Sequence, residues 1–310
     1  MKDIAFSKNP FSIYDFLGYL FPGAFLVISL MCIVDINELS IPSILDFFQD
    51  KFYHFSFESS LYLVVVYYVV GHVLSYLSSI TIERFSLWMF GYPSEFLMGQ
   101  KTRCSYITRV VTHCGSRNCK SFRHCDINTN TILLRSIIWL LLSPIAIPYT
   151  LLSKFFSLKS FIVKPLDRHT RKCVGVGIGQ LESRLGHDLT NDDVDYSRLI
   201  YHYYARKCPQ FLSRTDNYVA LYGFLRSSCL AFNILTIMTP ILWINEIDHM
   251  SLILLVASLS LISFILFLAF MKFYRRYSLE IFMMLISDDE LRQNSNLKYS
   301  NYVNVNIQSR

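Results

Sequence analysis

The sequence predicts an all-α integral membrane protein with about four transmembrane helices, one re-entrant or interfacial segment and a helical cytoplasmic region. Two uncharged apolar runs, residues 227–245 and 250–271, indicate this class most clearly. At a rise of about 1.5 Å per residue, each run forms a helix about 30 Å long, which matches the hydrocarbon core of a bilayer. Composition agrees, because 53% of the residues are hydrophobic and only 17% are charged.

An N-terminal transmembrane hairpin is predicted over residues 1–82, with spans at 16–34 and 59–82. The first apolar run begins too far from the N-terminus for a signal peptide, and it ends without a small-residue cleavage site. Pro22 lacks a backbone N–H, so we expect a kink that neighbouring helices cover. The loop 35–58 carries five acidic residues and one lysine. The positive-inside rule therefore places this loop outside the cell.

The charge pattern in the middle of the chain conflicts with a simple count of membrane crossings. Segments 83–135 and 154–226 are both predicted to be cytoplasmic, because basic residues outnumber acidic ones in each. The apolar segment 136–153 lies between them. If it crossed the membrane, one of the acidic loops would have to lie inside, so we predict a re-entrant or interfacial segment bent at Pro144 and Pro148. A true fifth span is the alternative, since long loops can translocate regardless of charge.

The cytoplasmic region 154–226 is predicted to be helical. One helix is expected to start near residue 191, and a second, 218–226, is expected to continue into the third span. Gly175, Gly177 and Gly179 are closely spaced here, but the pattern fits neither a P-loop nor a dinucleotide-binding fingerprint. We interpret these glycines as a flexible turn.

The C-terminal transmembrane hairpin is predicted over residues 227–271. Its short connector carries Glu246 and Asp248 but no basic residue, which places it outside. The tail 272–310 begins with a basic cluster and is predicted to be cytoplasmic, first as a short helix ending near residue 292 and then as a disordered polar segment. The N-terminus is predicted to be cytoplasmic as well.

One stripe of small residues and two polar residues stand out within the spans. Small residues allow two helices to approach closely in lipid, and buried polar groups join helices by hydrogen bonds. His72 is an ionisable residue inside a span, and such residues usually face a bundle interior, a relay or a pore. The alternative is a neutral imidazole hydrogen-bonded to a neighbouring helix. The candidates for helix packing or a pore are Gly71, His72, Ser75, Ser79 and Asn233, with Ser78 in the same stripe.

The sequence indicates neither a catalytic site nor a cofactor or metal site. A cluster of cysteine and histidine residues in the basic segment lacks the paired spacing typical of zinc sites, so free thiols in a reducing compartment are expected. The cluster comprises Cys104, His113, Cys114, Cys119, His124 and Cys125. We expect no nucleic-acid partner despite the net charge of +6, because the basic residues lie beside membrane spans, where topology and anionic lipid account for them.

Three segments resemble patterns in uncharacterised bacterial multi-spanning membrane proteins. They are YDFLGYLFPG at 14–23, WMFGYPS at 88–94 and NYVALYGFLR at 217–226. The resemblance covers about a fifth of the chain and implies no activity. It implies a bacterial inner membrane, the plasma membrane of the cell, as the location. Membrane proteins of this kind and size often resemble accessory or effector components of bacterial defence and stress systems, including antiviral defence.

Three classes of function remain open from the sequence. The first is a non-enzymatic membrane effector or pore component that forms a homo-oligomer in the bilayer. The second is a membrane anchor or adaptor that recruits a cytoplasmic protein partner through 154–226. The third is a small transporter or membrane enzyme, ranked last because polar residues in the spans are sparse.

Overall fold

The computed structural model describes residues 16–35, 57–99, 129–156, 162–186, 196–207, 212–243 and 249–287. Throughout these ranges the regular structure is helical, with no strand. Four helical segments are long and apolar enough to cross a membrane, namely Phe16–Val34, Ser59–Leu97, Arg214–Leu242 and His249–Ile286, and a fifth, bent pair lies between the second and third. The predicted fold class is therefore confirmed.

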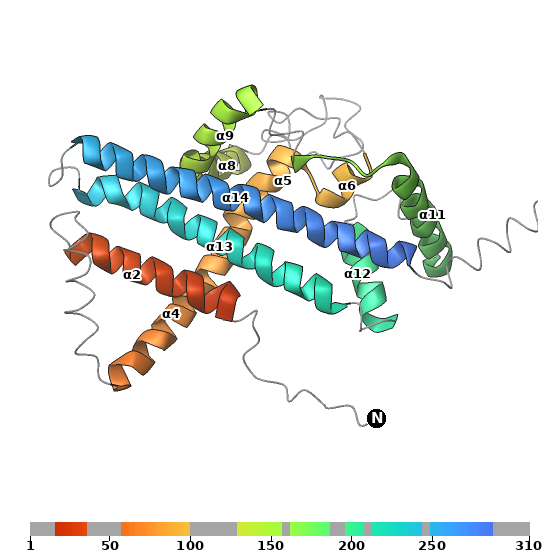
Figure 1. The fold of residues 1–310 in the computed structure, drawn as a ribbon, viewed down its shortest axis with the longest axis horizontal. Helices are drawn as coiled ribbons and strands as arrows, with labels where there is room; N and C mark the ends of the chain where they lie inside the picture. Colours follow the sequence, from red (N-terminus) through yellow and green to blue (C-terminus); the bar gives the residue numbers. More distant parts are fainter. Residues whose placement is uncertain are drawn as a thin grey trace, which may run out of the picture.

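The longest helices, α13 (Leu212–Trp243) and α14 (His249–Ile286), lie side by side and form the centre of the molecule (Figure 1). Their contact includes the fully buried Phe267 and a reciprocal pair in which Ser263 Oγ donates to the Cys229 carbonyl at 3.1 Å. The prediction that 218–226 continues into the third span is confirmed. Helix α14 is about 57 Å long by its 38 residues, so it extends well beyond a bilayer core.

The N-terminal hairpin packs against this pair. A π-helix (Phe16–Leu20) leads into α2 (Phe21–Asp35), and α4 (Phe57–Ser78) crosses α2 and α13 obliquely (Figure 1). Pro22 lies where the π-helix passes into α2, and it is buried by neighbouring elements, as we expected for a proline within a span. Beyond α4 the chain stays helical, through the π-helix η2 (Ser79–Glu83) and α5 (Arg84–Phe90), and α6 (Pro93–Leu97) follows Gly91.

The predicted re-entrant segment forms a sharply bent pair of helices. Helix α8 (Thr129–Leu141) and helix α9 (Ser143–Phe156) meet at Leu142 with a bend of 79°. Pro144 has no N–H for the preceding turn, so the helix cannot continue straight through this point. The bend itself is fully buried, since Leu142 and Ile145 have no exposed surface.

A second hydrophobic core lies at one end of the bundle, which we call the α11–α12 end (right in Figure 1). Here α11 (Arg168–Leu185) and α12 (Tyr196–Lys207) pack on the last turns of α14 through Leu181, Ile200 and Phe282. At the opposite end α2 and α13 end and α4 and α14 begin, and we call it the connector end. The helix start predicted near residue 191 lies outside the described residues. The part of the tail beyond residue 287 also lies outside them.

The prediction of a flexible turn at Gly175, Gly177 and Gly179 is wrong, because all three lie inside α11. Asp167 caps the start of the helix by accepting from the Thr170 N–H, and Gly186 ends it with φ of 70°. A Cβ on Gly177 would lie 2.8 Å from Leu285 Cγ, so this glycine permits close packing of α11 on α14. Helix caps and tertiary contact therefore outweigh the low helix propensity of glycine.

Candidate functional site

The α2–α4 crossing depends on two glycines. A Cβ on Gly71 would overlap the carbonyl oxygen of Tyr19, and a Cβ on Gly23 would overlap the carbonyl oxygen of Tyr67. The two backbones therefore touch at this point, as small residues allow in lipid. The contact lies within one chain, whereas the sequence alone left open which helix Gly71 would meet.

His72 lies beside this crossing with an exposed side chain. Its ring stacks on Tyr19, with centroids 3.9 Å apart, and meets Tyr68 edge to face at 4.5 Å. The ring of the neighbouring Phe21 meets that of Phe224 in α13, with centroids 5.7 Å apart. Tyr19, Tyr68 and His72 therefore lie toward the α11–α12 end of the bundle. The structure thus gives His72 aromatic neighbours on its own chain, and its role in a pore stays a prediction.

The serine stripe separates into two sets. Ser78 is buried against α13, and its hydroxyl donates to the Ser75 carbonyl at 2.9 Å and accepts from Arg226 Nε at 3.1 Å. Ser75 contributes its carbonyl oxygen, which lies 3.5 Å from a second Arg226 nitrogen. Ser79 faces outward, and its hydroxyl donates to the Tyr76 carbonyl at 2.7 Å. Ser75 and Ser78 therefore join α4 to α13, and Ser79 does not.

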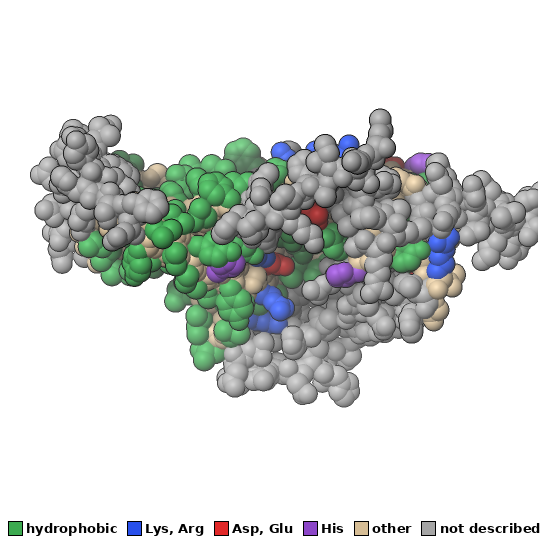
Figure 2. Space-filling view, turned by 90° about the horizontal axis from the view of Figure 1, so that it is seen from below, with side chains coloured by type: hydrophobic (Ala, Val, Ile, Leu, Met, Phe, Trp, Pro, Cys, Tyr) green, Lys and Arg blue, Asp and Glu red, His purple; other side chains and the backbone are tan. Residues whose placement is uncertain are grey.

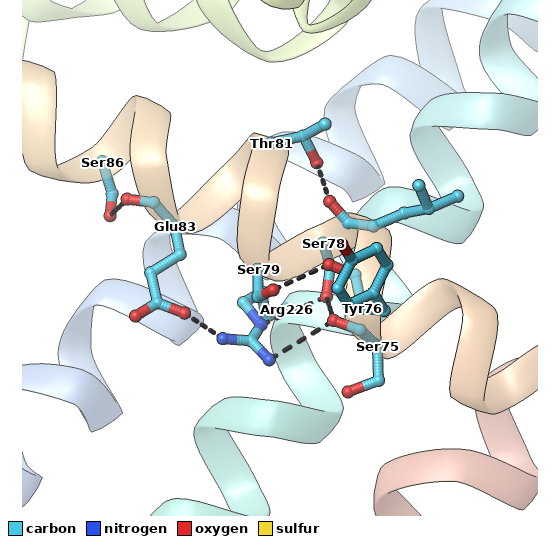
Figure 3. Close-up of polar contacts among 9 residues, drawn as sticks. Ser75, Tyr76, Ser78, Ser79, Thr81, Glu83, Ser86 and Arg226 are labelled. Atoms are coloured by element: carbon cyan, nitrogen blue, oxygen red, sulfur yellow. Dashed lines mark hydrogen bonds and ion pairs between the residues drawn. The ribbon is translucent and has the colours of Figure 1, made fainter.

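Arg226 completes this group through an ion pair with Glu83 (Figure 3). The arginine projects from α13 and the glutamate from η2, and their side chains are 11% and 28% exposed. A guanidinium this buried requires compensation for its lost hydration, and three acceptors on α4 and η2 provide it. We call Ser75, Ser78, Glu83 and Arg226 the Arg226 cluster.

The π-helix η2 positions Glu83 in this cluster. Hydrogen bonding from i to i+5 places an extra residue in the turn, so the residues that follow project from a different face than in a continuous α-helix. Thr81 Oγ1 donates to the Leu77 carbonyl at 2.7 Å within this region. Single π-turns of this kind occur frequently at functional sites.

Sequence reasoning missed this pairing, although it contained a usable signal. Glu83 ends the second predicted span and Arg226 precedes the third, and the charge rule placed both at the same membrane surface. Opposite charges at adjoining span ends are natural partners when the two helices pack. That packing is a tertiary contact, which a single sequence does not display.

Asn233 joins α13 to the bent pair. Its side-chain amide donates to the Leu141 carbonyl at 2.7 Å. In a continuous helix this carbonyl would accept from the Ile145 N–H, which instead bonds to Leu142 at 3.0 Å. Ser260 of α14 acts in the same way, because its hydroxyl donates at 2.7 Å to the Pro144 carbonyl, whose usual partner would be the missing N–H of Pro148. Each side chain thus satisfies a carbonyl that the break or a proline leaves free.

Both arms of the bent pair contact the same short helix, α5. The guanidinium carbon of Arg135 in α8 lies 5.2 Å from the centroid of the Trp88 ring, and Tyr149 in α9 meets Phe90 edge to face at 5.5 Å. Trp88 and Phe90 are only two residues apart, so the arms leave and return at one level of the bundle. This geometry favours a re-entrant path for the segment.

Residues that could bind a metal are not grouped in the described ranges, where no set of three or more His, Cys, Asp or Glu side chains has suitable geometry. The cysteine and histidine cluster at 104–125 lies outside those ranges. Cys173 has His169 Nε2 at 3.8 Å on the same helix.

The chain matches no protein-family model, and neither curated proteins nor solved structures show a significant similarity to it. The architecture therefore defines its class: a multi-pass α-helical membrane protein with buried polar contacts between spans. Hydrophobic side chains cover much of the surface toward the connector end, whereas the charged and histidine side chains visible on the same face lie from the middle of the molecule toward the α11–α12 end (Figure 2).

Proposed function

We propose that this protein is a non-enzymatic membrane effector, or a component of a pore, that acts as a homo-oligomer in a bacterial stress or defence system. The observation that supports this proposal is the outer face of α4. Large apolar side chains on this face are exposed at helical spacing. They include Leu61, Val65, Val69, Val73 and Tyr76.

Lipid alone would accept the aliphatic residues of this face, so they do not distinguish lipid from protein as the neighbour. His72 does, because it projects from the same side of α4 and an imidazole is costly in hydrocarbon unless protein or water surrounds it. A second copy of the chain would supply that environment. The inner side of α4 is already occupied by the Gly71 contact and the Arg226 cluster.

The test measures detergent-solubilised oligomer size and membrane potential on overexpression. Val69→Trp adds bulk to the outer face of α4, and Ile265→Trp is a matched control on α14, since these residues are 55% and 54% exposed. We expect the wild type and Ile265→Trp to be oligomeric and to depolarise the membrane, and Val69→Trp to do neither. A monomeric wild type, or equal effects of both variants, would contradict the proposal.

His72→Leu separates the two parts of the proposal. Leucine is favourable in a span, so this variant should insert normally. Retained oligomer size with lost depolarisation would assign the imidazole to a pore or relay. Unchanged depolarisation would leave it as a packing residue.

A second candidate function is a membrane anchor or adaptor that recruits a cytoplasmic protein through 154–226. The outward face of α11 favours it, because Val176 is 57% exposed and lies between Gly175 and Gly179, where an added Cβ would meet nothing within 4 Å. A soluble protein that co-purifies with the wild type, is lost from Val176→Glu and leaves the membrane potential intact would support this alternative.

A further inference from the structure

Aromatic side chains gather where the apolar runs of α13 and α14 end, toward the α11–α12 end of the bundle. The ring centroid of Tyr222 in α13 lies 5.3 Å from that of Tyr274 and 5.6 Å from that of Tyr277, both in α14. The ring centroids of Tyr218 and Phe273 are 6.3 Å apart. Tyrosine is enriched where one end of the side chain is apolar and the other meets the headgroups. We therefore place the lipid–water boundary at the level of these residues on α13 and α14.

Arg275 lies at this level and is incompletely paired. One terminal nitrogen of its guanidinium donates to the Lys164 carbonyl at 3.0 Å, and its Nε is buried without a hydrogen-bond partner. Within the described residues no carboxylate lies in ion-pair distance of Arg275. The other terminal nitrogen of the guanidinium makes no hydrogen bond to a described residue. Hydrogen bonds between charged groups are among the strongest, so the site favours an additional acceptor that carries negative charge.

The surroundings of Arg275 are positively charged. Lys272 precedes it by three residues and so lies on the same face of α14, and it is exposed, as are Arg276 and Lys164. The next acidic residue of α14, Glu280, is five positions further on and projects from a different face. The local charge is therefore open to an external anion.

We propose that Arg275 and Lys272 bind the phosphate of an anionic phospholipid headgroup in the leaflet at the α11–α12 end. A guanidinium fork matches the geometry of phosphate oxygens, and a neighbouring ammonium adds charge without demanding a fixed direction. The aromatic level places both cations among headgroups, where phosphate is abundant. Basic sites beside membrane helices attract anionic lipid in the same way.

The test uses the purified full chain in a neutral detergent and measures its thermal unfolding midpoint against added phosphatidylglycerol. Arg275→Gln removes the charge but keeps an amide donor for the Lys164 carbonyl, and Arg276→Gln removes the same charge from the adjacent exposed position. We expect the lipid to raise the midpoint of the wild type and Arg276→Gln. Arg275→Gln should require about fivefold more lipid for the same shift.

Three further arms complete the design. Phosphatidylcholine tests whether any lipid suffices, and inorganic phosphate at matched ionic strength tests a soluble source of the same chemistry. Arg275→Lys keeps the charge without the fork, and we expect it to lie between the wild type and Arg275→Gln. The site would be overturned if phosphatidylcholine raised the unfolding midpoint as much as phosphatidylglycerol does. It would also be overturned if Arg275→Gln and Arg276→Gln weakened the response to phosphatidylglycerol equally. If inorganic phosphate raised the midpoint as much as phosphatidylglycerol does, the bound phosphate group would not have to come from a lipid.

Should Arg275→Gln fail to fold, native mass spectrometry of the wild type gives an independent readout. Retention of one phosphatidylglycerol per chain in preference to phosphatidylcholine, with the preference weakened in Lys272→Gln, would support the proposal. Equal retention of the two lipids would overturn it.

Discussion

Two glycines of this chain show how strongly the surroundings decide what a residue contributes. Gly71 touches the backbone of Tyr19, whereas Gly175 has open space where a Cβ would lie. We therefore predict that Gly71→Ala destabilises the protein by about 1–3 kcal/mol, as overpacking does. Gly175→Ala should stabilise α11 by about 0.5–1 kcal/mol, because alanine is the better helix former. Thermal unfolding in detergent measures both changes, and a Gly71→Ala variant as stable as the wild type or more so would contradict the α2–α4 contact.

The Arg226 cluster provides the second prediction at this scale. Removing one partner of a buried pair leaves the other charge uncompensated, and the partial exposure of Glu83 moderates that cost. We expect Arg226→Gln and Glu83→Gln each to destabilise the protein by about 2 kcal/mol. The double variant should lose less than the sum of the two, since neither charge is then stranded. Strictly additive unfolding free energies would show that the two side chains do not interact.

At the scale of elements, long uncharged runs were sufficient to predict the helices of the two hairpins. Short-range patterns were less informative. The glycines of α11 predicted a turn, since the sequence does not show that Gly177 packs on Leu285. Likewise, Pro144 and Pro148 predicted a bend at 136–153, but Asn233 and Ser260 were not predictable as its partners, because they lie about 90 and 115 residues away in sequence. Local chemistry predicts a break, and only the fold supplies what satisfies it.

Helix α11 gives a prediction of pH dependence. Hydrogen bonds from the side chain and the backbone N–H of Thr170 lower the pKa of the Asp167 carboxyl below its ordinary value. A lowered folded-state pKa means that the stabilisation is present above the unfolded pKa of about 4 and is lost as pH falls through the folded value. Asp167→Asn should cap the helix without titrating. Between neutral pH and about pH 3, the unfolding midpoint of the wild type should therefore fall further than that of Asp167→Asn. An equal fall in both proteins would contradict the cap.

At the scale of the whole molecule, the buried contacts fix relative levels along the bundle. The Arg226–Glu83 pair and the Tyr222–Tyr274 contact join residues that flank the ends of apolar runs. Three segments therefore change from apolar to polar character at the same end. A membrane surface imposes such a common boundary. The number of spans then depends on whether α8 and α9 cross the bilayer.

The last prediction tests that path. Only the second span, the bent pair and the third span separate loop 35–58 from connector 244–248, so a re-entrant pair places both on one side of the membrane and a crossing pair places them on opposite sides. We expect a membrane-impermeant thiol reagent to label Leu45→Cys and Asp248→Cys from outside intact cells. The wild type is the control and should stay unlabelled until permeabilisation, because six of its eight cysteines, including Cys114, Cys173 and Cys208, are predicted to be cytoplasmic and the other two lie in predicted spans. If only one of the two introduced cysteines reacts, the bent pair crosses the bilayer and the chain has five spans.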